Sequence, residues 1–299
     1  MSKIKRRDFI KILGVGVVGT IATTVSGKTA VDIGKSLLNP ESAKTEAGSN
    51  PMYPPPVQGA DYAMMIDVGA CIGCRRCLHA CKLENNTPDA PSNIEWIDLF
   101  EMDNSRPVTE VEGIPPKESD KNYLDAPKKG FWYLSFNCFH CEDPPCTKVC
   151  PTGATYKDSD GLVLINYDIC IGCRYCLAAC PYNARHFNWW SPNTPPTRVS
   201  PIDGSVVPVN PKVPLRPKGV AEKCTFCVHR IRAGNPVPRC VEVCPKRARH
   251  FGDLNDPTSE VSILLQTVRT HRLREDLNTR PMLYYFTRGV KWTNDGEKI

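Results

Sequence analysis

The sequence CIGCRYCLAACP spans residues 170–181, and a near copy, CIGCRRCLHAC, spans residues 71–81. Both stretches contain the spacing C-x2-C-x2-C-x3-C, and each has a glycine two residues after its first cysteine. The chain has 299 residues and 16 cysteines, and the eight cysteines outside these stretches form two further groups with the same closing C-x3-C-P and a longer middle. These groups are Cys138, Cys141, Cys146 and Cys150, and Cys224, Cys227, Cys240 and Cys244. Every cysteine of the chain therefore belongs to a group of four.

This spacing is typical of iron–sulfur ligation. Three thiolates of a C-x2-C-x2-C-x3-C run bind one [4Fe-4S] cluster, and the fourth binds a neighbouring cluster. Gly73 and Gly172 allow the backbone to approach a cluster or to adopt a positive φ angle, and the amides of such a turn point toward the sulfurs. A proline follows three of the closing cysteines, whereas Lys82 follows Cys81. Sixteen thiolates predict four [4Fe-4S] clusters, with iron as the only metal.

Other uses of cysteine fit this pattern less well. The chain is long enough to bury a core without disulfides, and the cysteines of a C-x2-C turn are poorly placed for bridging. Zinc prefers two separated C-x2-C pairs for each site. Attachment of c-type haem requires C-x-x-C-H, and a radical enzyme would require C-x3-C-x2-C, neither of which occurs. A disulfide scaffold and a structural zinc protein remain the weaker alternatives.

The spacers between the groups predict how the groups pair. Only 19 residues separate Cys150 from Cys170, and they contain the turn signal Asp160-Gly161 followed by the apolar run 162–165. The second and third groups are therefore predicted to form one ferredoxin-like unit, and the first and fourth a second unit split around it. The alternative pairs the first group with the second and the third with the fourth across spacers of 56 and 43 residues.

The crossing of each fourth ligand to the neighbouring cluster then assigns four sites. They are site 1, Cys71, Cys74, Cys77 and Cys244; site 2, Cys224, Cys227, Cys240 and Cys81; site 3, Cys138, Cys141, Cys146 and Cys180; and site 4, Cys170, Cys173, Cys176 and Cys150. Each site has a full set of four thiolates, which leaves no iron open to a substrate. The sequence thus predicts electron transfer, with no catalytic residues.

The order of the four groups, the stretch CRYCLAACPYNARHF at 173–187 and the stretch FGDLNDPTSEVS at 251–262 resemble one family. It is the family of four-cluster iron–sulfur subunits of the dimethyl sulfoxide, polysulfide and tetrathionate reductase type, and the likeness covers residues 60–288. Subunits of periplasmic hydrogenases are also similar. The resemblance implies an α+β protein of two fused ferredoxin-like 2[4Fe-4S] units with long irregular insertions.

The same resemblance implies partners. The chain is expected to relay electrons between a molybdopterin-type catalytic subunit and a polytopic, quinone-interacting membrane subunit of a periplasmic respiratory oxidoreductase. The alternative is the relay subunit of a periplasmic nickel–iron hydrogenase. Membrane association is expected only through a partner. Lysine and arginine are numerous near the cysteine groups, and the net charge is +6, but nothing beyond this basicity suggests nucleic-acid binding.

The amino terminus resembles an export signal. Residues 5–11 read KRRDFIK, which matches the twin-arginine pattern. The uncharged stretch at 12–27 is shorter than the ~20 residues of a membrane span. A basic amphipathic start to a soluble domain is the alternative. The sequence predicts export of the folded protein to the periplasm or the outer face of the cytoplasmic membrane.

The rest of the chain is expected to divide around these motifs. The expected parts are the signal at 1–30, a linker at 31–60, the first group and an insertion at 61–130, a central ferredoxin unit at 131–190, a proline-rich insertion at 191–223, the fourth group at 224–255, and a C-terminal helix and tail at 256–299. The proline-rich insertion is expected on the surface, as a docking arm or an ordinary loop. Core packing is the favoured role for Trp189 and Trp190. A helix is predicted to begin at Asp256-Pro257, with an apolar face that starts at Val261.

Overall fold

A computed structural model describes residues 52–89, 91–103, 127, 130–191, 197–200 and 203–288. The chain divides into two compact units, residues 1–49 and 50–299, and all described residues belong to the second. The predicted twin-arginine signal at 1–30 and most of the predicted linker at 31–60 lie outside the described residues.

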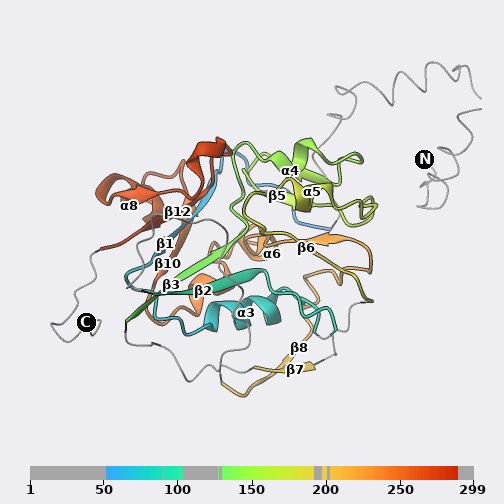
Figure 1. The fold of residues 1–299 in the computed structure, drawn as a ribbon, viewed down its shortest axis with the longest axis horizontal. Helices are drawn as coiled ribbons and strands as arrows, with labels where there is room; N and C mark the ends of the chain where they lie inside the picture. Colours follow the sequence, from blue (N-terminus) through green and yellow to red (C-terminus); the bar gives the residue numbers. More distant parts are fainter. Residues whose placement is uncertain are drawn as a thin grey trace, which may run out of the picture. The chain divides into compact units, whose positions relative to one another are not determined.

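The second unit combines short helices with small sheets, which confirms the α+β class (Figure 1). The helices are α3 (Arg76–Glu84), α4 (Pro145–Lys148), α5 (Tyr175–Ala178), α6 (Val228–Ile231), α7 (Arg239–Glu242), α8 (Glu260–Thr267) and the 3-10 helix η3 (Glu275–Leu277). The strands are β1 (Tyr62–Asp67), β2 (Ile97–Asp103), β3 (Phe131–Asn137), β4 (Thr155–Lys157), β5 (Val163–Ile165), β6 (His186–Phe187), β7 (Thr197–Val199), β8 (Val206–Pro208), β9 (Ala221–Glu222), β10 (Arg249–Asp253), β11 (Thr270–His271) and β12 (Leu283–Phe286).

The largest sheet has the strand order β10-β1-β12-β11 and brings distant parts of the chain together. Strand β1 precedes the first cysteine group and pairs antiparallel with β10, which follows the fourth, so that Tyr62 lies opposite Asp253. On its other edge β1 pairs parallel with β12. This pairing places the first and fourth groups at the same end of one sheet, although more than a hundred residues separate them in the sequence.

Strand β1 is buried on both faces, as its nearly continuous apolar sequence YAMMID requires. Side chains alternate between the two faces of a strand. Ala63 and Met65 pack with α8, whereas Met64 and Ile66 face an interior cluster that contains or contacts seven of the sixteen cysteines. The sheet therefore separates α8 from that cysteine-rich interior.

The second and third groups flank the hairpin formed by β4 and β5. Asp160-Gly161 lies in the turn, as predicted, and Gly161 has the positive φ angle of +78° that this turn requires. Helix α4 of the second group contacts α5 of the third. The second and third groups are thus adjacent in space as well as in sequence.

The insertions contribute three further two-stranded sheets. Strand β2 pairs with β3, β6 with β9, and β7 with β8. The surface position predicted for the proline-rich insertion is correct for β7 and β8, where Val199 and Val206 are exposed. It is wrong for Arg216, whose buried guanidinium donates hydrogen bonds to the carbonyls of Asn85 and Asn86.

Two other local predictions are wrong. The last long helix begins after Ser259, whose side chain accepts a hydrogen bond from the Ser262 amide, and not at Asp256-Pro257. Asp256 instead accepts a hydrogen bond from the Thr258 amide in the preceding turn. Trp189 and Trp190 are each 55% exposed and are not part of a core. Arg174 stacks on the Trp189 ring, 4.6 Å from its centre.

Candidate metal centres

The first and third cysteine groups share one backbone path, as their near-identical sequences suggest. Gly73 and Gly172 both have φ angles of +73°, and Arg75 and Arg174 two residues later are left-handed as well. A short helix, α3 or α5, begins at the residue after each arginine. This double reversal curls the loop so that its first three cysteines can face one point.

Both glycines are needed for close packing as well as for their φ angles. A Cβ atom at Gly73 would lie 2.5 Å from the ring of Tyr133, which is itself buried. A Cβ atom at Gly172 would collide with the backbone carbonyl of Gly219. The ligand loops are therefore pressed against β3 in one case and against the segment before β9 in the other.

Site 1 surrounds a cavity. Cys71, Cys74 and Cys77 line it together with Cys244, the closing cysteine of the fourth group. Arg249 forms part of the wall of this cavity. Burial raises the pKa of the Cys71 thiol to about 12. The structure thus brings together the four cysteines that the sequence assigned to this site.

Site 2 is the most enclosed of the four. Cys224, Cys227, Cys240 and Cys81 are all buried, and their thiols are mutual electrostatic neighbours. The Asn85 amide lies 3.4 Å from the Cys81 sulfur and 3.6 Å from the Cys227 sulfur, so it can donate to either. Sequence reasoning missed Asn85, although its position one helical turn after Cys81 could have indicated it.

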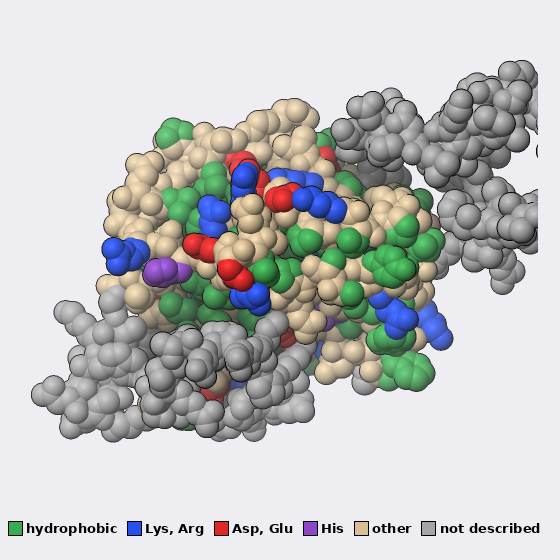
Figure 2. All heavy atoms as spheres, turned by 45° about the horizontal axis from the view of Figure 1, so that its top comes forward, with side chains coloured by type: hydrophobic (Ala, Val, Ile, Leu, Met, Phe, Trp, Pro, Cys, Tyr) green, Lys and Arg blue, Asp and Glu red, His purple; other side chains and the backbone are tan. Residues whose placement is uncertain are grey.

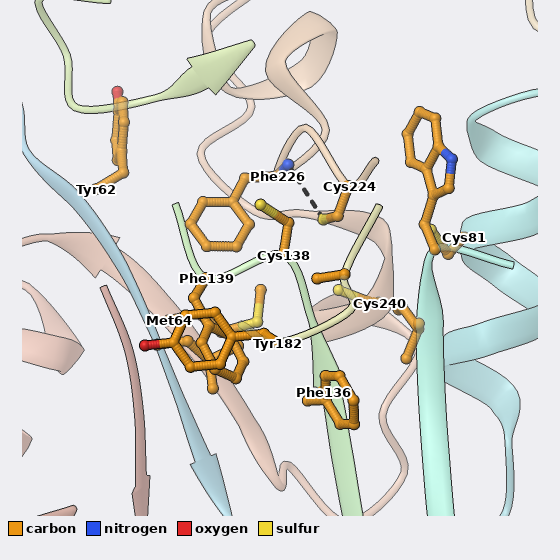
Figure 3. Close-up of a cluster of buried hydrophobic side chains, with 14 of the residues drawn as sticks. Tyr62, Met64, Cys81, Phe136, Cys138, Phe139, Tyr182, Cys224, Phe226 and Cys240 are labelled. Atoms are coloured by element: carbon orange, nitrogen blue, oxygen red, sulfur yellow. Dashed lines mark hydrogen bonds between the residues drawn. The ribbon is translucent and has the colours of Figure 1, made fainter. Parts of the chain in front are cut away.

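Site 3 also surrounds a cavity. Its lining includes Cys138, Cys141, Cys146 and Cys180, so the closing cysteine of the third group joins three from the second. Arg185 also lines this cavity. Burial raises the pKa of the Cys141 thiol to about 12. Figure 3 shows Cys138 and Cys224, from sites 3 and 2, within a shell of aromatic side chains.

Site 4 lies in a separate buried cluster. Cys170 and Cys176 of the third group are buried in it, and Cys150 of the second group packs against it. Cys173 is half-buried on the same ligand loop. Burial raises the pKa of the Cys176 thiol, and Cys150 is among its electrostatic neighbours.

The donor chemistry of these sites fits iron–sulfur clusters. All sixteen cysteines are free thiols, and thiolate is the ligand that such clusters require. Backbone amides point at several sulfurs: those of Thr155, Phe226 and Ala248 lie 3.3, 3.4 and 3.2 Å from the sulfurs of Cys150, Cys224 and Cys244. Figure 3 shows the contact from Phe226. Such amide donors stabilise anionic sulfur.

His140 belongs to the second group but serves the protein framework. Its Nδ1 accepts a hydrogen bond from the Val163 amide, and its Nε2 lies 2.9 Å from the carbonyl oxygen of Cys224. Burial, followed by the nearby Lys223, holds the pKa of His140 well below its usual range. The neutral ring therefore joins the second group, β5 and the fourth group.

Within the described ranges, no three His, Cys, Asp or Glu side chains are grouped as ligands of a single metal ion. No helix in the same ranges is long and apolar enough to cross a bilayer. On the face shown in Figure 2, Lys and Arg side chains lie beside Asp and Glu side chains.

Two family models match the chain, and both describe a 4Fe-4S dicluster domain. One covers residues 130–194, which contain the second and third groups, and the other covers residues 70–154 and 169–248. The second model alone accounts for more than half of the chain. The chain belongs to the 4Fe-4S dicluster family.

Several curated proteins are similar to this 4Fe-4S dicluster protein over most of their length. The iron–sulfur subunit of a putative dimethyl sulfoxide reductase of Halobacterium salinarum is 43% identical over 75% of this chain and 78% of its own. A menaquinone reductase iron–sulfur cluster-binding subunit of Nitratidesulfovibrio vulgaris is 37% identical over 76% and 89%. A selenate reductase subunit of Mesobacillus selenatarsenatis is 41% identical over 78% and 74%.

Proposed function

We propose that the chain holds four [4Fe-4S] clusters at sites 1–4 and relays electrons through them within a respiratory oxidoreductase. The observation that carries this proposal is that thiols of successive sites are electrostatic neighbours of each other. Between sites 1 and 2 the neighbouring thiols are Cys77 and Cys240. Between sites 2 and 3 they are Cys224 and Cys138. Between sites 3 and 4 they are Cys146 and Cys176. The sites therefore follow one another in the order 1, 2, 3, 4.

The clusters, when bound, supply one-electron reduction and oxidation at potentials that depend on charge, hydrogen bonds and exposure. The residues of the chain determine the rest. Four thiolates saturate each site, so no coordination position remains for a substrate. The aromatic shell around Phe136 and Phe139 excludes water from the middle of the series. Both features suit transfer between partners and leave the bond-making chemistry to another subunit.

The partners are proposed from the relatives. The similar proteins from Halobacterium and Mesobacillus are named as subunits of dimethyl sulfoxide and selenate reductases, and that from Nitratidesulfovibrio as a menaquinone reductase subunit. We therefore infer a molybdopterin-type catalytic subunit on one side and a quinone-interacting membrane subunit on the other. These names give the nickel–iron hydrogenase alternative no support.

Metal analysis and double substitution test the ligand assignment. The anaerobically purified chain is expected to contain about sixteen iron and sixteen sulfide per chain, since each cluster has four of each. Cys74→Ser and Cys244→Ser should impair the same cluster, so the double variant should lose no more iron than either single variant. Cys74→Ser combined with Cys150→Ser should lose the iron of two clusters. The opposite result would favour pairing of the first group with the second, and zinc without sulfide would exclude the proposal.

Export by the twin-arginine route remains part of the proposal. Replacement of Arg6 and Arg7 by lysine should leave the cluster-loaded protein in the cytoplasm, because this route moves folded proteins and reads the arginine pair. The cellular fraction that contains the iron–sulfur signal measures the effect. If the double variant is exported from the cytoplasm as fully as the unmodified protein, export by the twin-arginine route is contradicted.

A further inference from the structure

Besides Arg75 on the ligand loop of site 1, three cationic side chains are buried among the cysteines: Arg185, Lys223 and Arg249. Each is at most 3% exposed. A buried cation is unfavourable unless an opposite charge and hydrogen bonds compensate it. The positions of these three relative to the sites therefore bear on what they do.

Arg249 lies between sites 1 and 2. It lines the cavity of site 1, and its guanidinium also lies 3.6 Å from the Cys240 sulfur of site 2. Ser135 and Asn137 of β3 accept hydrogen bonds from it at 2.6 and 3.0 Å and fix its direction. Its Nε has no hydrogen-bond partner among the described residues.

Arg185 has the corresponding place between sites 3 and 4. It lines the cavity of site 3 and donates a hydrogen bond to the Cys146 sulfur of that site at 2.9 Å. Cys176 of site 4 is an electrostatic neighbour of the same guanidinium. Thr155 accepts a further hydrogen bond from the guanidinium at 3.2 Å. One planar guanidinium thus donates to a ligand of site 3 and has a ligand of site 4 as an electrostatic neighbour.

Lys223 occupies the remaining gap, between sites 2 and 3. Its ammonium donates to the carbonyl oxygen of Cys224 at 2.7 Å and is 3.5 Å from the His140 ring. Its electrostatic neighbours include Cys224 of site 2 and Cys138 of site 3. Each of the three gaps between successive sites therefore contains one buried cation.

Two other arginines with buried side chains have carboxylate partners. Arg216 pairs with Glu222 at 3.2 Å, and Arg232 pairs with Asp160 at 2.8 Å. In the part of the chain that the structure describes, Arg185, Lys223 and Arg249 form no ion pair with a carboxylate. Among the described residues, the candidate counter-charges for these three cations are the cysteine thiolates and what those thiolates bind.

We propose that Arg249, Lys223 and Arg185 are positioning residues that raise the reduction potentials of both sites beside them. The inference rests on the proposed cluster sites. An added electron makes a thiolate-bound cluster more negative, so a fixed cation nearby favours the reduced form. A cation between two sites acts on both, so it raises the two potentials together.

Single substitutions test the pairwise effect. Arg185→Gln should shift the reduction equilibria of sites 3 and 4 at least tenfold toward the oxidised form, which is 59 mV for a one-electron couple. Sites 1 and 2 should keep their potentials. Arg249→Gln should shift the potentials of sites 1 and 2 in the same direction and leave those of sites 3 and 4 unchanged. The readout is potentiometric titration followed by low-temperature paramagnetic resonance, with potentials assigned through one Cys→Ser variant for each site.

Arg247→Gln is the matched control, because Arg247 follows Cys244 closely in sequence but its side chain is 82% exposed. It should leave all four potentials unchanged. Arg185→Lys keeps the charge and should shift sites 3 and 4 less than Arg185→Gln does. Equal shifts at all four sites, or no shift in either Gln variant, would overturn the inference. Absence of cubane signals in the unmodified protein would instead overturn the proposed function.

A second pair of variants tests the inference if the Gln variants fail to bind clusters. Ser135→Asp and Thr155→Asp place a carboxylate beside Arg249 and Arg185 without removing either guanidinium. Each should lower the potentials of the same two sites as the corresponding Gln variant. If the Gln and Asp variants all fail to load, loading of Arg185→Lys with near-normal potentials still supports a role for charge. Failure of that variant as well would assign the residue a purely structural role and refute the inference.

Discussion

At the scale of single residues, the ligand loops depend on backbone conformations that most side chains avoid. Gly73, Arg75, Gly172 and Arg174 all have positive φ angles within two ligand loops. Arginine in this region is strained by roughly 1–2 kcal/mol, so the loops contain unfavourable conformations that the rest of the fold maintains. The glycines additionally make room for Tyr133 and for the Gly219 carbonyl.

Substitution of the two loop glycines should therefore differ from substitution of an exposed one. Gly172→Ala should cost more than the ~1–2 kcal/mol of the φ angle alone, because the added methyl group collides with backbone that cannot rotate away. Gly73→Ala meets a buried tyrosine ring and should also exceed that cost. Both variants should lose cluster iron, measured by metal analysis beside thermal unfolding.

Gly234→Ala is the control for that comparison. Gly234 has a φ angle of +86°, and no atom lies within 4 Å of the position that an added methyl group would take. The Gly234→Ala variant should lose only the stability that the unfavourable φ angle costs, and it should keep its iron. Equal destabilisation in all three variants would mean that close packing at the ligand loops contributes nothing.

At the scale of elements, helix α8 shows how a cap and tertiary packing together set a boundary. Ser259 has the extended backbone of an N-cap and accepts from the Ser262 amide at 3.3 Å. Glu260 follows in the first turn, where a negative charge is favourable. Val261 and Leu264 then bury one face against the sheet.

The cap can be tested directly. Ser259→Ala should lower the free energy of unfolding by about 1 kcal/mol, the usual effect of removing an N-cap side chain. Asp256→Ala should have a smaller effect, since its carboxylate lies on an exposed turn and bonds Thr258. Chemical denaturation of the loaded protein measures both. A larger effect at Asp256 would restore the helix start at Asp256-Pro257 that the sequence suggested.

Local chemistry explains which elements could be predicted from the sequence. Asp160-Gly161 specified its turn because few residues other than glycine tolerate the required φ angle. The start of α8 was misplaced because Asp256-Pro257 and Ser259 are both acceptable starts, and only the packing of Val261 on the sheet distinguishes them. Trp189 and Trp190 were misjudged because apolar composition alone does not say which face of the molecule a residue occupies.

The proposed ligand sets follow from the cysteine spacing, because that spacing carries the ligation pattern, whereas the side chains around them could not be predicted from the sequence. Strand β1 pairs with β10 and β12, each nearly two hundred residues or more away in sequence. That register brings Arg249 to the gap between sites 1 and 2. Nothing near Arg249 in the sequence records the position of Cys77 or Asn137. The placement of the cations is thus a property of the long-range fold.

At the scale of the whole molecule, a buried ion-pair network fastens the fourth cysteine group to the central hairpin. Arg232, which follows α6, donates to Asp160 through Nε at 2.8 Å and to Asp158 at 2.9 Å. It also donates to the Pro54 carbonyl at 2.8 Å. The carboxylate of Asp160 is fully buried. Three segments distant in sequence therefore meet at one guanidinium.

Arg232→Met should destabilise the protein by ~3–5 kcal/mol, because it leaves a buried carboxylate without its partner. The measurement is the decrease in melting temperature relative to the unmodified protein. Arg280→Met is the matched control: its ion pair with Glu142 is about half exposed on both sides, and such pairs contribute ~0–1 kcal/mol. Adding Asp158→Asn and Asp160→Asn to Arg232→Met should recover part of the loss. Similar effects at Arg232 and Arg280 would contradict a fastening role for the buried network.

Removal of iron should destabilise the whole second unit, because cysteines form part of both its main core and the separate cluster at site 4. Burial raises the pKa of the Cys176 thiol beside Arg185 and of the Cys240 thiol beside Arg249, and it raises the pKa of Cys71 to about 12. Without metal these thiols are neutral at pH 7. Arg185 and Arg249 would then be buried charges without anionic partners, which is strongly unfavourable. Anaerobic chelation of iron should lower the melting temperature and expose the core to protease, and iron with sulfide should restore both. The loss on chelation should be smaller in Arg249→Met than in the unmodified protein, since that variant leaves one charge fewer to bury. An unchanged melting temperature after complete loss of iron would show that the protein chain holds this core together without its clusters.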